Sequence, residues 1–238
     1  MKKVKILFIL AVCALLAGCA APAADTGGGD YGCIRGELSS LTPEAAGAYL
    51  AVVDELAGRL GFEEAEAAPG ECLHGGFVRD WDGDGTPELC LVLKTSPRDA
   101  DGTPLYGWFP PALALYTFRD GQAVPAGERD LYFATGGRES VAAVLPAGDG
   151  LRYVLWDYSA LTQESIVVCC ALTDGALQET ELPDEVTAAL GAETARAFLE
   201  ALGANRAQPL LYNNSGEARP EGPANARELR EALAARAA

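Results

Sequence analysis

Short apolar segments alternate with turn residues between Gly75 and Glu181, and this pattern constrains the fold more than any other feature. Five segments have the length and composition of strands: 89–94, 112–118, 141–145, 151–158 and 165–172. Three intervening turns contain an Asp-Gly pair: 119–122, 147–150 and 173–176. Asp-Gly supplies the positive φ that two-residue hairpins require. Consecutive hairpins predict a mainly antiparallel β meander.

Helical patterns flank the predicted meander. Thr42-Pro43-Glu44 has the cap, proline and acid of a helix start, and apolar residues follow at helical spacing until Gly61. Further helices are predicted from about 184 to 202 and from 225 to 236, the last with only a thin apolar face. The expected fold class is therefore α+β. A single domain over 40–212 precedes a linker and C-terminal helix over 213–238.

The charge balance restricts the partners of the chain. There are 18 Lys and Arg residues against 34 Asp and Glu residues, which gives a formal charge of −16. Such a surface repels nucleic acid and anionic headgroups, and it suits cations or simply solubility. We therefore expect no nucleic-acid partner.

Residues 1–18 have the organisation of an export signal. Lysines at the start precede the apolar run 6–16, which is shorter than the roughly 20 residues that span a bilayer. The sequence Leu16-Ala17-Gly18-Cys19 resembles a bacterial lipobox. That resemblance implies cleavage before Cys19, a thioether-linked diacylglycerol with palmitate-type acyl chains on its thiol, and display on the extracytoplasmic face of the cell membrane. Ordinary cleavage at 21–23 is the alternative, and it would release a soluble protein. With lipid on Cys19, residues 19–39 are expected to form a flexible tether.

The remaining cysteines suit an exported protein, in which thiols can pair. Five follow Cys19: Cys33, Cys72, Cys90, Cys169 and Cys170. Because five is odd, at least one stays unpaired within the chain. One candidate disulfide joins Cys33 to Cys72 and would link the N-terminal region to the loop before the first strand. Cys90 either pairs with Cys169 or Cys170, or these residues are small buried side chains. The spacing contains no redox or zinc motif.

One acidic stretch, from Asp80 to Leu89, carries the pattern of a calcium loop. Carboxylates at positions 1, 3 and 5 (Asp80, Asp82 and Asp84) precede a glycine at position 6. Such spacing wraps oxygen ligands around Ca²⁺. The backbone carbonyl of Thr86 and the carboxylate of Glu88 complete the predicted ligand set. An EF-hand is excluded, because Leu91 stands where its last glutamate belongs. The alternative is a metal-free turn in which the aspartates cap backbone N–H groups.

Two resemblances accompany this loop. Its spacing is similar to the calcium loops of integrin-type FG-GAP repeats, with Glu88 in place of the more usual aspartate. The loop occurs once, whereas a propeller needs several blades of similar pattern. The loop, the Pro-Glu-Leu that follows it and the Tyr-x-Phe-x-Asp-Gly hairpin together resemble lipoproteins of Gram-positive-type bacteria. That resemblance implies a location and a fold, without an activity.

The sequence favours a non-catalytic binding or structural module. His74 is the only histidine, and no Gly-x-Ser-x-Gly or P-loop motif is present. Trp108, Trp156 and Tyr158 are candidates for a ligand surface, or they pack the sheet. The partner would be an unknown protein or an envelope glycan. The alternative is an envelope hydrolase that acts on glycan or peptide through acidic residues.

Overall fold

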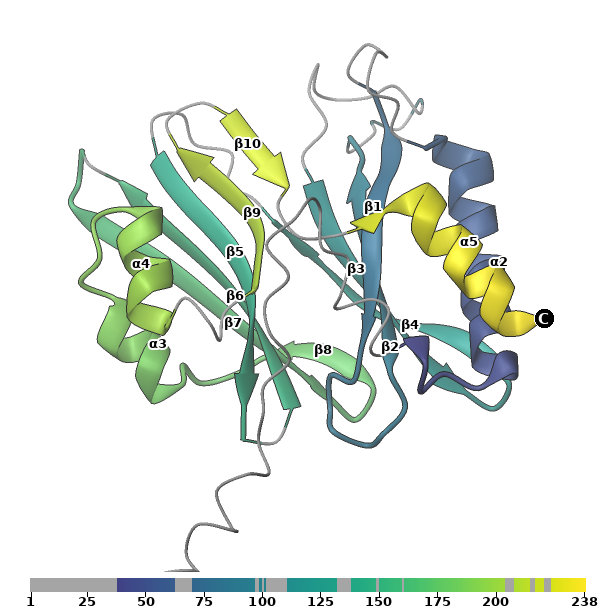
Figure 1. Cartoon of the computed structure of the whole chain (residues 1–238). Coiled ribbons are helices and arrows are strands. Elements are labelled where there is room, and N and C mark those ends of the chain that lie inside the picture. Colours follow the sequence, from purple (N-terminus) through teal and green to yellow (C-terminus); the bar gives the residue numbers. More distant parts are fainter. Residues whose placement is uncertain are drawn as a thin grey trace, which may run out of the picture. The chain divides into compact units, whose positions relative to one another are not determined.

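The computed structural model shows helices packed with two antiparallel sheets, which confirms the predicted α+β class (Figure 1). It describes residues 38–62, 70–96, 99, 101, 111–131, 138–148, 150–159, 161–203, 208–214, 217–220 and 224–238. The signal and most of the tether lie outside these residues.

The first sheet has the strand order β11-β1-β2-β3-β4. Its strands are β1 (Cys72–Arg79), β2 (Glu88–Lys94), β3 (Pro111–Arg119), β4 (Gln122–Asp130) and β11 (Ala224–Asn225). The second sheet has the order β10-β9-β5-β6-β7-β8. Its strands are β5 (Arg138–Ala147), β6 (Gly150–Ser159), β7 (Glu164–Thr173), β8 (Ala176–Glu179), β9 (Gln208–Asn214) and β10 (Glu217–Pro220). The predicted meander is therefore divided between two sheets.

The Asp-Gly turns close hairpins as predicted. Asp120 and Gly121 have φ values of 51° and 78° between β3 and β4, and Asp174 and Gly175 have values of 52° and 73° between β7 and β8. Two consecutive residues with positive φ match the twist of the flanking strands. Backbone pairing runs up to both turns, with Arg119 opposite Gln122 and Thr173 opposite Ala176 in register.

Helix α2 (Pro43–Leu60) begins and ends where the sequence predicts. The Thr42 hydroxyl accepts a hydrogen bond from the Ala45 N–H at 3.1 Å, and Gly61 ends the helix with a φ of 77°. The buried face of α2 includes Tyr49, Val53 and Leu56, which join a core that contains residues of both sheets. Burial of these apolar side chains, more than helix propensity, stabilises α2.

The second sheet has a separate core on its other face. Helices α3 (Asp184–Ala189) and α4 (Ala195–Leu202) cover this face (Figure 1). Phe198 of α4 stacks on Trp156 of β6 with ring centroids 5.0 Å apart, and both side chains are fully buried. The Glu139 carboxylate of β5 accepts a hydrogen bond from the Ala195 N–H at 2.7 Å, which fixes the start of α4 on the sheet.

The C-terminal region differs from its predicted role as a linker and weakly docked helix. Strand β9 continues to Asn214 and β10 lies inside the predicted linker, where it pairs with β9. Helix α5 (Ala226–Ala237) packs against α2 and β1, and Leu229 and Leu233 are fully buried. The thin apolar face is sufficient because both leucines enter the main core. Residues beyond 212 therefore belong to the same folded unit.

Candidate metal centre

The acidic loop joins β1 to β2 at one end of the first sheet. Asp80 follows the last residue of β1, and Glu88 is the first residue of β2. Gly83 and Gly85 have φ values of 74° and 89°, in the region that favours glycine. These two glycines let the chain turn sharply enough to bring Asp80 back toward Glu88.

Hydrogen bonds within the loop orient its carboxylates. The two oxygens of Asp80 accept from the Gly83 N–H at 2.8 Å and from the Gly85 N–H at 3.0 Å. The Asp82 carboxylate accepts from the Asp84 N–H at 3.2 Å. A carboxylate oxygen has two lone pairs, so each of these oxygens can accept a hydrogen bond and still face a cation. The bonds therefore agree with both the metal-bound and the metal-free interpretation.

Three of the predicted ligands converge in space. One carboxylate oxygen from each of Asp80, Asp82 and Glu88 lies within 4.8 Å of the other two. Ca²⁺ binds oxygen at about 2.3–2.6 Å, so two ligands of one ion stand no more than about 5 Å apart. The described residues thus contain an all-oxygen group that could hold a metal ion.

The other two predicted ligands are placed differently. Asp84 is exposed, is not part of the group of three, and its carboxylate accepts a hydrogen bond from the Thr86 N–H at 2.6 Å. Thr86 is half-buried, and ligation by its backbone carbonyl stays a prediction.

Glu88 is the buried member of the group. Its side chain is 2% exposed, and one carboxylate oxygen accepts a hydrogen bond from the Trp81 N–H at 2.8 Å. Burial above all, together with repulsion from the three aspartates of the loop and against the lowering effect of that hydrogen bond, raises the pKa of Glu88 to about 8. Burial is also the main cause that raises the pKa of Asp82. A cation at this position would relieve both effects.

Trp81 fixes the loop to both sheets. It is fully buried, and its indole N–H donates to the Cys90 sulfur at 2.8 Å. Its carbonyl accepts from the Leu151 N–H of β6 at 2.8 Å. Gly150 lies so close that an added Cβ would stand 2.2 Å from the Trp81 oxygen. The acidic loop is thus part of the junction between the sheets.

Tyr49 of α2 fixes the other end of the loop. Its hydroxyl donates to the Pro87 carbonyl at 2.9 Å, and its side chain is fully buried. Burial and the nearby Glu88 carboxylate raise the pKa of Tyr49, so the phenol stays protonated and can donate. The anchoring roles of Tyr49 and Trp81 could not be predicted from the sequence, because both depend on contacts between distant segments.

The predicted aromatic ligand surface is not formed at Trp156. This side chain is fully buried between Phe198 and Tyr158, whose ring centroid lies 6.0 Å away. Trp156 therefore packs the second core, as the alternative interpretation held. Tyr158 is half-buried, and Trp108 lies outside the described residues.

The cysteines described by the structure are buried. Cys169 and Cys170 have free thiols, which excludes their pairing with Cys90. Burial, followed by the neighbouring Cys170, raises the pKa of Cys169 to about 11, so this thiol is a poor nucleophile. Cys72 is the first residue of β1, whereas the sequence suggested a preceding loop. Its expected partner Cys33 lies outside the described residues, so that disulfide stays a prediction.

Cys19, where the sequence predicts lipidation, also lies outside the described residues. Among the helices that the structure does describe, none combines the length and apolar character needed to cross a bilayer. Comparison of the chain with protein-family models, with curated proteins and with solved structures gives no match.

Proposed function

We propose that this chain is a lipid-anchored extracytoplasmic protein, a non-catalytic binding or structural module whose acidic loop holds Ca²⁺. The observation that carries the calcium site is the convergence of Asp80, Asp82 and Glu88 within 4.8 Å. Support for the anchor comes from the sequence Leu16-Ala17-Gly18-Cys19 after a short apolar run.

The donor chemistry favours calcium over other metals. All three side chains offer carboxylate oxygens, which suit hard cations. Ca²⁺ accepts six to eight oxygens in flexible geometry, so the Thr86 carbonyl, the Asp84 carboxylate and water can complete its ligands. Outside the cell, calcium modules bind with dissociation constants of about 10⁻⁴–10⁻³ M, which is sufficient there.

The proposed role of the ion is structural. It would neutralise carboxylates that burial and mutual repulsion now hold at raised pKa values. The same loop bonds to β6 through the Trp81 carbonyl and to α2 through the Pro87 carbonyl. Calcium would therefore stabilise the place where α2 and the two sheets meet.

Thermal unfolding of the full chain in detergent tests the calcium site. With calcium at about a hundredfold excess over the dissociation constant, mass action adds about 2.7 kcal/mol. We expect the melting temperature to rise by about 5 °C or more, given roughly 2–4 °C per kcal/mol for a chain of this size.

Two matched variants decide whether the acidic loop is responsible for that rise. Asp82→Asn should abolish it. Asp99→Asn should keep it, because Asp99 lies in a similar but exposed acidic turn, where it accepts from the Asp101 N–H. An unchanged melting temperature in the parent protein, or an equal rise in Asp82→Asn, contradicts the proposal.

Mass spectrometry of the protein from bacterial membranes tests the anchor separately. We expect acyl chains on an N-terminal Cys19, and their loss in Cys19→Ala but not in Cys33→Ala. A mature N-terminus downstream of Cys19, without lipid, would instead support cleavage at the alternative site.

A further inference from the structure

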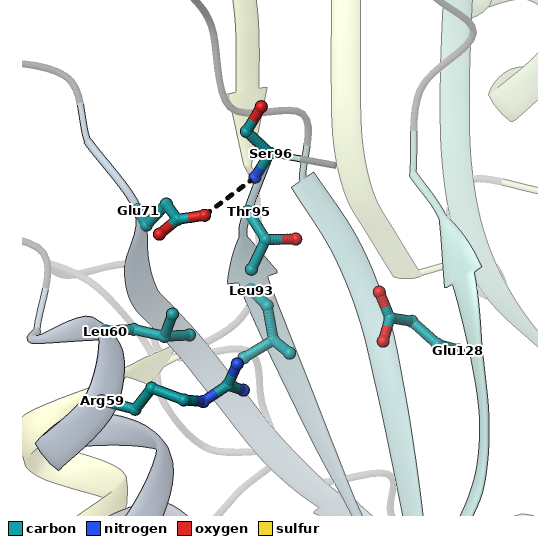
Figure 2. Close-up of a pocket in the computed structure, with 7 residues that line it drawn as sticks. All are labelled: Arg59, Leu60, Glu71, Leu93, Thr95, Ser96 and Glu128. Carbon is teal, nitrogen blue, oxygen red and sulfur yellow. Dashed lines mark hydrogen bonds between the residues drawn. The ribbon is translucent and has the colours of Figure 1, made fainter. Parts of the chain in front are cut away.

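A pocket of about 480 Å³ lies on the first sheet, beside the end of α2 (Figure 2). Its volume falls in the range of about 300–1,000 Å³ that is usual for small-molecule sites. Seven side chains line it: Arg59, Leu60, Glu71, Leu93, Thr95, Ser96 and Glu128. They come from the last turn of α2, the ends of β1 and β2, and β4, so the pocket is separate from the acidic loop.

Opposite charges face this pocket from different elements. Figure 2 shows Arg59 extending from α2 toward Leu93, with the Glu128 carboxylate across the pocket on β4. In the part of the chain that the structure describes, no hydrogen bond or ion pair engages the Arg59 guanidinium.

The electrostatics of Tyr116 agree with this arrangement. Burial is the main cause that raises its pKa, Glu128 and then Glu55 raise it further, and Arg59 lowers it. The charges of Arg59 and Glu128 therefore act on the same stretch of β3, which lies beside β4 in the sheet.

The rest of the lining consists of two leucines, two hydroxyl side chains and the carboxylate of Glu71. Leu60 and Leu93 contribute aliphatic surface, and Leu93 is 4% exposed. Glu71 has one carboxylate oxygen fixed by the Ser96 N–H at 3.2 Å. The pocket thus combines one cation, two carboxylates and a small apolar surface.

We propose that this pocket binds a zwitterionic ligand, a free α-amino acid or dipeptide with an apolar side chain. Its carboxylate would pair with Arg59, its ammonium group with Glu128, and its side chain would contact Leu60 and Leu93. A guanidinium matches a carboxylate in a two-pronged hydrogen bond. The inference goes beyond the proposed calcium module and does not depend on it.

The same lining disfavours other small ligands. Two glutamates repel phosphates and simple carboxylic acids, whereas Arg59 repels amines that lack a carboxylate. Only a ligand with both charges satisfies both sides of the pocket.

Calorimetric titration of the full chain in detergent, at constant calcium, tests the inference with two probes, L-leucine and L-alanyl-L-leucine. We expect at least one probe to bind. Leucinamide lacks the carboxylate and N-acetylleucine lacks the ammonium group, so each should bind at least tenfold more weakly than L-leucine, or than the corresponding dipeptide analogues if the dipeptide is the ligand. Absence of binding by both probes up to about 10 mM, or equal binding by the blocked analogues, overturns the proposal.

Variants then test which charged side chains of the pocket contact the ligand. Arg59→Gln should weaken binding by about tenfold to a hundredfold, in line with a lost hydrogen bond to a charged group. Glu128→Gln should weaken it as well. Arg196→Gln is the matched control, since Arg196 is an exposed helical arginine that pairs with Glu200 on α4. Unchanged affinity in Arg59→Gln, with an unchanged melting temperature, contradicts the assignment.

Discussion

The acidic loop between β1 and β2 and the turn between β3 and β4 are both built from aspartate and glycine, yet they differ in what surrounds them. In the turn, Asp120 is exposed, and its positive φ of 51° allows the hairpin between β3 and β4 to close. In the loop, Asp80 and Asp82 are half-buried and converge with the buried Glu88. A candidate cation site therefore arises from the burial and convergence of carboxylates, whereas Asp-Gly composition alone gives a turn.

The largest predicted effect concerns Gly150, where the second sheet meets the acidic loop. Gly150→Ala places a Cβ 2.2 Å from the Trp81 carbonyl oxygen, at a φ of 141° that disfavours side chains. Because neither backbone can move freely, backbone strain and steric overlap both contribute, and we expect a loss of about 4 kcal/mol or more in the free energy of unfolding. Urea denaturation measures this loss, and a loss below about 1 kcal/mol would contradict the described junction.

The second effect is a pH dependence of the free energy of unfolding, which arises from the Glu88 carboxyl group of the loop. The folded pKa of Glu88, about 8, lies above its ordinary value of 4.5. A raised carboxyl pKa stabilises the fold fully below pH 4.5, and this stability is lost as the pH rises through about 8. Without calcium, we therefore expect the free energy of unfolding to fall between pH 5 and pH 8, by up to about 4 kcal/mol.

Glu88→Gln is the variant that isolates this dependence. It removes the titrating group but keeps an oxygen that can accept from the Trp81 N–H, so the decline between pH 5 and pH 8 should become shallower. Urea denaturation at each pH measures the slope. An identical slope in the parent and the variant would assign the pH dependence to other groups.

The third effect is smaller and belongs to the turn between β7 and β8. Gly175 has a φ of 73°, and the Cβ that Gly175→Ala adds would meet the end of the Arg119 side chain. Since a flexible arginine can move aside, only the backbone strain remains, and we expect a loss of about 1 kcal/mol. Urea denaturation of this variant beside Gly150→Ala tests the ranking, and an equal or larger loss at Gly175 reverses it.

Local chemistry explains what could be predicted from the sequence. The Asp-Gly pairs at 120–121 and 174–175 predicted hairpins because the required φ is a property of those residues. Thr42 and Gly61 predicted the ends of α2, because a capping hydroxyl and a positive φ are also properties of single residues. The spacing from Asp80 to Glu88 identified the three carboxylates that converge, although the burial of Glu88 arises only in the folded chain.

Long-range contacts explain what could not be predicted. Nothing local to a hairpin says which sheet it joins, so the division into two sheets was not foreseen. Residues 208–220 lack a strand pattern, and they form β9 and β10 by pairing with β5 and with each other. The pocket joins residues from Arg59 to Glu128, whose proximity exists only in the folded chain.

Calcium titration calorimetry on the chelator-treated full chain tests the central claim most directly, with Asp80→Asn and Asp120→Asn as a matched pair. Asn keeps the turn geometry at either position, so both variants should fold. We predict one calcium ion per chain for the parent protein and for Asp120→Asn, and no measurable binding for Asp80→Asn. Absence of binding in the parent protein, or undiminished binding in Asp80→Asn, would contradict the account.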